Sequence, residues 1–271
     1  MCIRDRCLIT LLKAREVPMI WGPPGIGKSD IVWSIGKEFN RRVIDIRLAL
    51  FDPTDIRGIP YFDPETKEMK WASSSEFPKI ASDNSIIFLD ELSSAVPTVQ
   101  VGGYQLTLNR RIGTYQLPDA VDVIAAGNRE NDRGVSYKMP SPLANRMTHL
   151  EMNVSFDDFQ NWAINNNIDL SVLSYLSWAK QDLFDFDAQK SGKAFATPRS
   201  WAKVSNILKN SKECPDNILT AIVGGTIGEG LAVKFMSHRR MNEKLPKSED
   251  ILSGKLKKFK YGKDISIIYA L

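Results

Sequence analysis

The sequence has few of the residues that build metal clusters and disulfide frameworks. Three cysteines and two histidines occur among 271 residues, and their spacing fits neither a zinc site nor a disulfide pattern. We therefore expect reduced thiols and a cytoplasmic protein. Apolar runs of membrane-spanning length and a signal-peptide core are also missing, so we expect no membrane association.

A strong excess of one charge is missing too, since the formal net charge is only +4. The charge is unevenly placed, because ten Lys or Arg and four Asp or Glu fall between Lys234 and Asp264. The C-terminal tail is therefore basic. A solvated surface or linker explains such a tail, and contact with nucleic acid or an acidic partner is the alternative.

The most informative stretch is Gly22-Pro-Pro-Gly-Ile-Gly-Lys-Ser29, which fits the pattern G-x-x-x-x-G-K-[ST]. Its glycines let backbone N–H groups close around phosphate oxygens. Lys28 supplies a charge for the β and γ phosphates, and the hydroxyl of Ser29 suits Mg²⁺. The predicted nucleotide-binding residues are Gly22, Pro23, Pro24, Gly25, Ile26, Gly27, Lys28, Ser29 and Asp30. A Gly/Pro-rich turn without a ligand is the alternative.

The flanks of this stretch fit the same interpretation. Val17–Trp21 is a short apolar run that predicts a strand, and Ile31, Ile35 and Phe39 have the spacing of a helix that begins near Lys28. The positive end of that helix would point at the phosphates. The sequence therefore predicts a nucleoside triphosphate as ligand.

An acidic pair, Asp90-Glu91, follows the apolar run Ser85–Leu89, which predicts a buried parallel strand. Open α/β sheets place ligand chemistry at the carboxyl ends of their strands. We expect Asp90 to hold Mg²⁺, and Glu91 to orient and deprotonate an attacking water. An exposed acidic turn is the alternative, which the phosphate-loop pattern earlier in the chain disfavours.

Asn128 ends the next apolar run, Val121–Ala126, after Gly127. A neutral amide at this strand end can hold the attacking water and a γ-phosphate oxygen. An ordinary turn residue is the alternative. The pattern Asn-Lys-x-Asp, which reads guanine, is absent from the sequence, and this favours ATP over GTP.

Strands and helices alternate in the first part of the chain, and helical periods replace them after Asn153. Further predicted elements are strands at 42–48 and 148–152, a loop at 52–60, a helix at 97–108, and hairpins at 61–71 and 111–117. Helices are predicted at 156–165, 169–180, 198–210, 215–223 and 226–240. The predicted fold class is α/β, with a parallel sheet followed by an all-helical subdomain.

We expect a nucleotide-binding core at 1–154, a helical subdomain at 155–240 and a basic extension at 241–271. The first six residues, Met-Cys-Ile-Arg-Asp-Arg, look like a translated sequencing adaptor. We therefore expect residues 1–6 to be non-native and the native N-terminus to be missing.

The order of these motifs resembles the AAA+ ATPases, and more narrowly their MoxR-like, dynein-related (AAA_5) branch, from about residue 14 to residue 255. Gly22–Ser29 matches the Walker A motif, and Asp90-Glu91 matches Walker B. Asn128 matches sensor 1. Ser141–Arg146 matches the segment that carries the arginine finger, and Ala196–Trp201 matches sensor 2. The hairpins at 61–71 and 111–117 fall where this branch carries a helix-2 insert and a hairpin before sensor 1.

The resemblance implies a P-loop NTPase core of three αβα layers, a helical lid, and a ring, usually a hexamer, that binds ATP and Mg²⁺ between subunits. Arg146 would then act on the neighbour's γ-phosphate, and Arg199 in its own chain. Guanidinium groups stabilise the charge of the transition state. The predicted catalytic residues are Glu91, Asn128, Arg146 and Arg199, and the metal ligands are Ser29 and Asp90. Surface or helix-start roles are the alternatives for the two arginines.

We expect a ring ATPase that remodels or matures a protein partner, because relatives often act with a protein that carries a von Willebrand factor A-type domain. A nucleic-acid motor or loader is the alternative, and a scaffold that binds nucleotide without hydrolysis is a third. The pair Asp90-Glu91 argues against the scaffold. One departure from the family is Gly102-Gly103, which would weaken the helix at 97–108.

Overall fold

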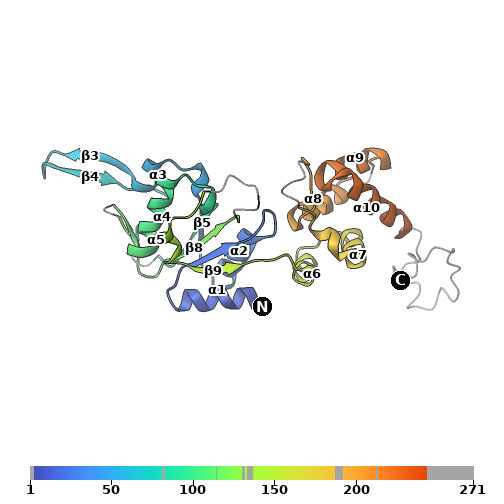
Figure 1. Ribbon diagram of the computed structural model, residues 1–271, viewed down its shortest axis with the longest axis horizontal. Helices are drawn as coiled ribbons and strands as arrows, with labels where there is room; N and C mark the ends of the chain where they lie inside the picture. Colours follow the sequence, from blue (N-terminus) through green and yellow to red (C-terminus); the bar gives the residue numbers. More distant parts are fainter. Residues whose placement is uncertain are drawn as a thin grey trace. The chain divides into compact units, whose positions relative to one another are not determined.

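The computed structural model describes residues 3–80, 83–113, 115–129, 132, 137–186, 192–211 and 213–242. The chain divides into two compact units, Met1–Asn153 and Val154–Leu271. The strands of the described part belong to the first unit, and the second is helical (Figure 1). Nearly all of the predicted basic extension at 241–271 lies outside the described residues, as do Met1 and Cys2.

The central sheet of the first unit has five parallel strands in the order β2-β5-β8-β1-β9. They are β1 (Pro18–Trp21), β2 (Val43–Arg47), β5 (Ile86–Asp90), β8 (Asp122–Gly127) and β9 (Thr148–Glu151). Each predicted strand is confirmed to within one residue. Because β1 lies between β8 and β9, the loop after β1 begins beside the carboxyl end of β8.

Side chains along β5 alternate between two buried faces. Ile87 and Leu89 belong to the core that includes residues of the helix after β5, whereas Ile86 and Phe88 point to the opposite face, and all four are at most 1% exposed. A strand that is buried on both faces needs helices on both sides. This explains why its sequence is a continuous apolar run.

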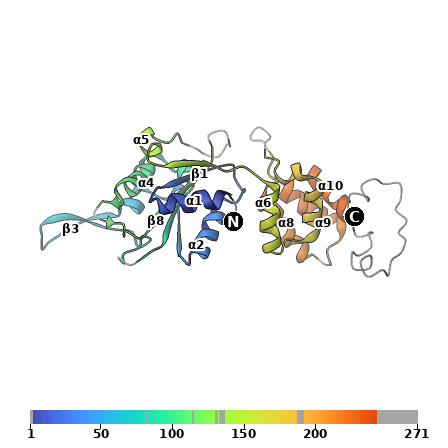
Figure 2. The ribbon, with the colours of Figure 1, turned by 90° about the horizontal axis from the view of Figure 1, so that it is seen from below.

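Helices form the two outer layers of this unit. On one face, α4 (Pro97–Asn109), α3 (Pro53–Arg57) and α5 (Ser141–Ala144) contribute to the main core. On the other face, α2 (Lys28–Glu38) packs on β2, β5 and β8, and α1 (Ile3–Lys13) packs on α2 and β1 (Figure 2). The fold is thus the predicted three-layer α/β core with a parallel sheet, followed by a helical lid subdomain.

The prediction of a loop at 52–60 is wrong, because α3 occupies Pro53–Arg57. Pro53 is the first helical residue, and the N–H of Asp52 donates to the carboxylate of Asp55 at 2.8 Å. Gly58 then ends the helix with φ of 87°. Proline and glycine therefore start and stop a helix here. The helices α1 and α5 were not predicted from the sequence.

The helix α4 continues without a break through Gly102-Gly103, so the expected weakening is not seen in its backbone. A Cβ atom on Gly102 would lie 2.4 Å from Cγ2 of Ile56 in α3. No side chain fits at that distance. The glycine therefore allows α3 to approach α4 closely, which is a packing reason for a residue that lowers helix propensity.

Two hairpins leave the first unit, as predicted. The first pairs β3 (Ile59–Asp63) with β4 (Glu68–Ala72), and the second pairs β6 (Arg111–Ile112) with β7 (Tyr115–Gln116). Figure 1 shows that the β3–β4 ribbon extends beyond the helices of this unit. Phe62 and Met69 face each other across the ribbon and are 59% and 62% exposed.

The second unit is built from α6 (Phe156–Asn165), α7 (Leu170–Trp178), α8 (Pro198–Lys209), α9 (Asp216–Ile227) and α10 (Glu229–Asn242). Its core centres on Tyr175, Trp201 and Phe235, whose rings lie 5.4–5.5 Å apart. All five predicted helices are confirmed. The end predicted at 223 is too early, because α9 continues through Gly224 to Ile227 and stops at Gly228, where φ is 98°. The start predicted at 226 is also too early, because α10 begins at Glu229.

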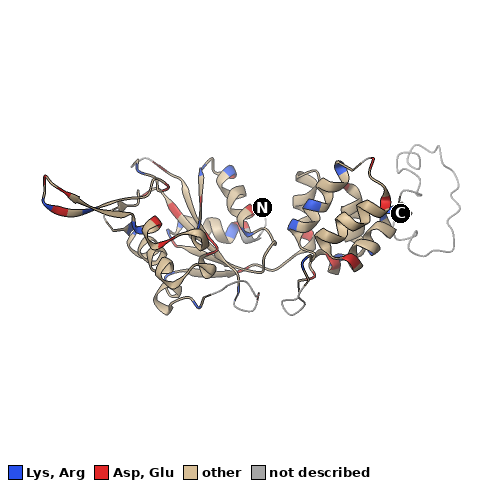
Figure 3. Ribbon diagram, turned by 90° about the horizontal axis from the view of Figure 1, so that it is seen from above, with Lys and Arg blue, Asp and Glu red and all other residues tan. Residues whose placement is uncertain are grey.

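Among the described residues, none of the helices has both the length and the apolar character needed to cross a membrane. Lys and Arg are interspersed with Asp and Glu along the described ribbon (Figure 3). The basic stretch that the sequence analysis singled out falls on residues that the structure does not describe, apart from the end of α10.

Candidate functional site

The loop Gly22–Ser29 connects β1 to α2 at the carboxyl edge of the sheet. Gly25 and Gly27 have φ of 76° and 97°, a region that other residues rarely adopt. A Cβ atom on Gly22 would lie 2.7 Å from the carbonyl oxygen of Met152, just after β9. Each glycine of the motif is thus required for a steric reason, either its positive φ or a close backbone contact. The loop leads directly into the first turn of α2.

Lys28, the first residue of α2, points its ammonium group back into this loop. Its Nζ atom donates to the carbonyl oxygens of Gly22 and Pro23 at 2.7 and 3.0 Å, and to Oδ1 of Asn128 at 2.8 Å. The structure therefore brings two residues together that are one hundred positions apart in the sequence. A cation over a glycine-rich loop at a helix N-terminus favours a phosphate ligand.

Ser29 and Asp90 form the second contact of the site, with Oγ of Ser29 donating to Oδ2 of Asp90 at 3.0 Å. A hydroxyl and a carboxylate are hard oxygen donors of the kind that Mg²⁺ prefers, together with water and phosphate oxygens. The pair therefore suits Mg²⁺ as the sequence predicts. When bound, the ion would supply positive charge beside the β and γ phosphates.

Asp45 is a neighbour of this pair that the sequence analysis missed. Burial, and then the nearby charge of Asp90, raise the pKa of the Asp45 carboxyl, while Arg47 opposes the shift. Nε of Arg47 lies 3.4 Å from Oδ2 of Asp45. Two carboxylates near each other favour a bound cation. The only sequence signal for Asp45 was an acidic residue inside an otherwise apolar strand.

Glu91 follows Asp90 in a left-handed conformation, with φ of 57° and ψ of 31°. Such a conformation is unusual for a residue other than glycine, and it costs about 1–2 kcal/mol. The side chain of Glu91 is exposed, while its N–H donates to Oδ1 of Asp90 at 2.9 Å. The turn thus fixes the carboxylate of Asp90 and leaves that of Glu91 open to solvent.

Ser93 is a further residue that sequence reasoning missed. Its hydroxyl accepts from the N–H of Asn128 at 3.0 Å and donates to the C=O of the same residue at 3.0 Å. A Cβ atom on Gly127 would lie 2.6 Å from Oγ of Ser93, so the contact needs glycine there. Ser93 therefore fixes the backbone of Asn128 to the turn after Asp90. A serine two residues after the acidic pair was its only signal.

The structure does not bring Arg146 to the loop. Its guanidinium lies over the ring of Tyr104, with the carbon 4.8 Å from the ring centroid. Arg199 is an exposed residue in the first turn of α8, in the second unit. Ile26 is buried and Asp30 is exposed in the first turn of α2. The predicted site therefore comes together around Lys28, Ser29, Asp90 and Asn128.

Arg129, the residue after Asn128, makes a local ion pair and a hydrogen bond to a neutral amide. Its guanidinium donates to Oε2 of Glu151 at 2.7 Å and to Oδ1 of Asn153 at 2.9 Å. These contacts tie the end of β8 to the end of β9. They place Arg129 in an ion pair within its own chain.

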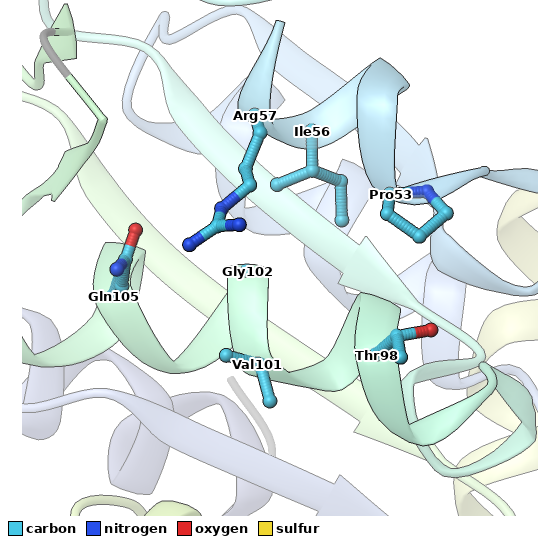
Figure 4. Close-up of a pocket in the computed structure, with 7 residues that line it drawn as sticks. All are labelled: Pro53, Ile56, Arg57, Thr98, Val101, Gly102 and Gln105. Atoms are coloured by element: carbon cyan, nitrogen blue, oxygen red, sulfur yellow. The ribbon is translucent and has the colours of Figure 1, made fainter.

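A pocket of about 250 Å³ lies between α3 and α4, away from these motifs. It is lined by Pro53, Ile56, Arg57, Thr98, Val101, Gly102 and Gln105. Figure 4 shows Arg57 and Gln105 extending toward each other across it. The pocket contains none of the predicted site residues. The candidate phosphate site is therefore identified from the glycine-rich loop and the charged side chains around it.

Solved structures that are similar to this chain include a "putative ATPase" from Cytophaga hutchinsonii, with 14% identity over 81% of this chain and a TM-score of 0.42. This chain spans 61% of that protein. The Holliday junction branch migration motor RuvB from Thermotoga maritima has 15% identity over 93% of this chain and 76% of its own length, with a TM-score of 0.46.

The sequence model of one family matches residues 18–154, about half of the chain. The match begins at β1 and ends just after β9, so it contains the phosphate loop, the acidic pair and Asn128. The chain belongs to this family, the AAA ATPases, the ATPase family associated with various cellular activities.

Proposed function

We propose that this chain is a MoxR-like AAA+ ATPase that hydrolyses ATP with Mg²⁺ in a ring and uses the energy to remodel a protein partner. The observation that carries the proposal is the convergence of three motifs, the phosphate loop, the acidic pair and Asn128, at one sheet edge. Lys28 contacts Asn128, and Ser29 contacts Asp90, within hydrogen-bond distance. The two hairpins, one before β5 and one before β8, support the MoxR-like branch.

Each residue at this edge has a defined role in the proposed hydrolysis. Backbone N–H groups of the loop and Nζ of Lys28 bind the phosphates. Ser29 and Asp90 hold the metal ion. Glu91 takes the proton from the attacking water, because its exposed carboxylate adjoins the metal ligand Asp90. Asn128 orients that water. When a phosphate binds, its oxygen replaces Oδ1 of Asn128 as an acceptor for Nζ of Lys28.

A neighbouring chain completes the site in this proposal, because Arg146 does not reach the loop of its own chain. The test mixes Arg146→Ala chains with Lys28→Ala chains. Some interfaces then pair an intact arginine with an intact loop, and partial activity should return. If rings that are shown to contain both variants stay inactive, Arg146 does not act in trans.

The remodelling role is tested by the ligand that stimulates turnover. We expect the rate of phosphate release to rise when a purified von Willebrand factor A-type protein from the same source is added. We expect the rate to stay unchanged when DNA or RNA is added. Stimulation by nucleic acid that falls steeply with salt would instead identify a nucleic-acid motor, since phosphate contacts release counterions. The Glu91→Gln variant controls for contaminating ATPases in both assays.

A further inference from the structure

The guanidinium of Arg146 has an unusual environment. It lies over the ring of Tyr104, and its Nη1 atom is buried with no hydrogen-bond partner among the described residues. A buried donor without an acceptor is costly, and folded proteins nearly always satisfy such groups. The aromatic ring offers a cation–π contact but no oxygen acceptor. Within the described part of its own chain Nη1 therefore has no acceptor, while the residue as a whole is only partly buried, so part of the side chain stays accessible.

The backbone on either side of Arg146 is fixed by other residues. Leu143 and Met147 are buried in the main core, at 1% and 7% exposure. The carbonyl oxygen of Ala144 lies 2.8 Å from Nε2 of His149, and Nδ1 of His149 accepts from the indole N–H of Trp21 at 2.7 Å. What remains to be set is the direction of the Arg146 side chain.

Tyr104 is placed to set that direction. It belongs to α4, which begins soon after the acidic turn, and its ring packs against the main core. Figure 1 shows α4 beside α5, the helix that precedes Arg146. A ring under a guanidinium orients the cation without using any N–H donor, so the donors that are not buried stay available for phosphate oxygens.

We propose that Tyr104 is a positioning residue that presents Arg146 to the ATP of a neighbouring chain. This rests on the proposed role of Arg146 in trans. Loss of the ring frees the arginine side chain to adopt other rotamers, so fewer sites have the guanidinium in place. Binding of ATP to the chain's own loop does not depend on Tyr104.

The test compares Tyr104→Leu with Tyr104→Phe. Tyr104→Leu should lower the maximal rate of phosphate release by about tenfold, the effect of a desolvated cation–π contact, with ATP affinity unchanged. Tyr104→Phe keeps the ring face and should keep most of the rate. Tyr115→Leu is the matched control, because its ring stacks on Phe77 of the same core and not on Arg146. An unchanged or higher rate for Tyr104→Leu would overturn the proposal.

A mixed-ring assay separates positioning from a local structural effect. Tyr104→Leu chains mixed with Lys28→Ala chains receive intact arginines from their neighbours, so turnover per intact loop should rise severalfold. If it does not rise, while Arg146→Ala recovers with the same Lys28→Ala chains, Tyr104 does not act through Arg146. If neither variant recovers, the proposed trans role itself has failed.

A double substitution tests the same link where folding is a concern. Tyr104→Leu should cost no further activity in an Arg146→Ala background, because both changes remove one function. A further tenfold loss would show that Tyr104 acts elsewhere. Tyr104→Met, whose flexible side chain fills the space without an aromatic face, replaces Tyr104→Leu if thermal unfolding shows that the leucine variant is not folded.

Discussion

At the scale of single residues, the site depends on hydrogen bonds that join distant parts of the chain. Nζ of Lys28 and Oδ1 of Asn128 are 2.8 Å apart, and the backbone of Asn128 is in turn held by Ser93. A phosphate that binds Lys28 competes with Asn128 for the same ammonium group. The amide of Asn128 is then available to the attacking water, while Ser93 keeps its backbone in place.

Ser93→Ala should therefore lower the rate of hydrolysis while ATP still binds. The change leaves the N–H and C=O of Asn128 without their side-chain partner, and it should also cost about 1–3 kcal/mol of stability. Ser94→Ala, one residue further on, is the control, since Asn128 does not use that hydroxyl. Urea unfolding, ATP titration and phosphate release measure the three effects. Equal turnover of the two variants would show that Ser93 does not position Asn128.

The residues that were predicted and those that were missed differ in how their signal is encoded. Gly22–Ser29 is a local pattern, so spacing alone predicts the loop. Ser93 and Asp45 gain their roles only from partners on other strands, Asn128 and Asp90. Tyr104 meets Arg146 only because α4 and α5 pack on the same face. Such contacts have no local pattern in a single sequence.

At the scale of elements, the two adjacent glycines of α4 have different environments. A Cβ atom on Gly102 would lie 2.4 Å from Ile56, whereas one on Gly103 would make ordinary contacts at 3.5 Å with Leu92 and 3.8 Å with Leu48. Gly102→Ala should destabilise the first unit by about 1–3 kcal/mol through overpacking. Gly103→Ala should be neutral or stabilise it by up to about 1 kcal/mol through helix propensity.

Chemical unfolding of the two alanine variants provides a matched comparison, because the substitution and the helix are the same. The expected order of stability is Gly103→Ala, wild type, Gly102→Ala. If Gly102→Ala is as stable as the wild type, α3 does not pack on α4 as closely as the structure indicates.

The helical unit should lose stability in mild acid because of His238. This side chain is 8% exposed and lies between the rings of Tyr175 and Trp178, and burial lowers its pKa. The folded state then prefers the neutral imidazole. Its contribution is complete above the ordinary histidine pKa of about 6.5 and is lost as the pH falls through the lowered value.

Hydrogen exchange of peptides from α8 and α10 measures this effect within the second unit. Protection should fall between about pH 7 and pH 5 in the wild type, and His238→Gln should flatten that dependence. His149→Gln, in the first unit, is the control and should leave it unchanged. A His238→Gln variant with the same pH dependence as the wild type would assign the effect to other groups.

Most elements could be predicted because their patterns agree with their environment. The five strands of the central sheet follow from apolar runs in the sequence. The five helices of the second unit follow from helical spacing and from caps such as Thr197-Pro198. The loop predicted at 52–60 failed, because the pair Asp52 and Asp55 acts as a capping box around Pro53. Proline and glycine were read there as loop signals, although they mark the two ends of a short helix.

At the scale of the whole molecule, the fold class follows from the order of the motifs along the chain. In the proposed function, the complete catalytic site needs residues of two chains. The family match covers the phosphate loop, the acidic pair and Asn128, while Arg199 belongs to the second unit. Arg146 rests on Tyr104 with an unsatisfied donor. In the proposed ring a neighbouring chain completes the site, and no pattern within a single chain encodes that contact.

In the proposed function, this sheet edge hydrolyses ATP with Glu91 as the base. The direct measurement is steady-state phosphate release by purified wild type and Glu91→Gln, with ATP binding measured in parallel. Removal of a general base should slow turnover by roughly 10²–10⁴-fold while affinity for ATP is kept. Equal turnover of the two proteins, or no turnover by the wild type with any partner, would contradict this function.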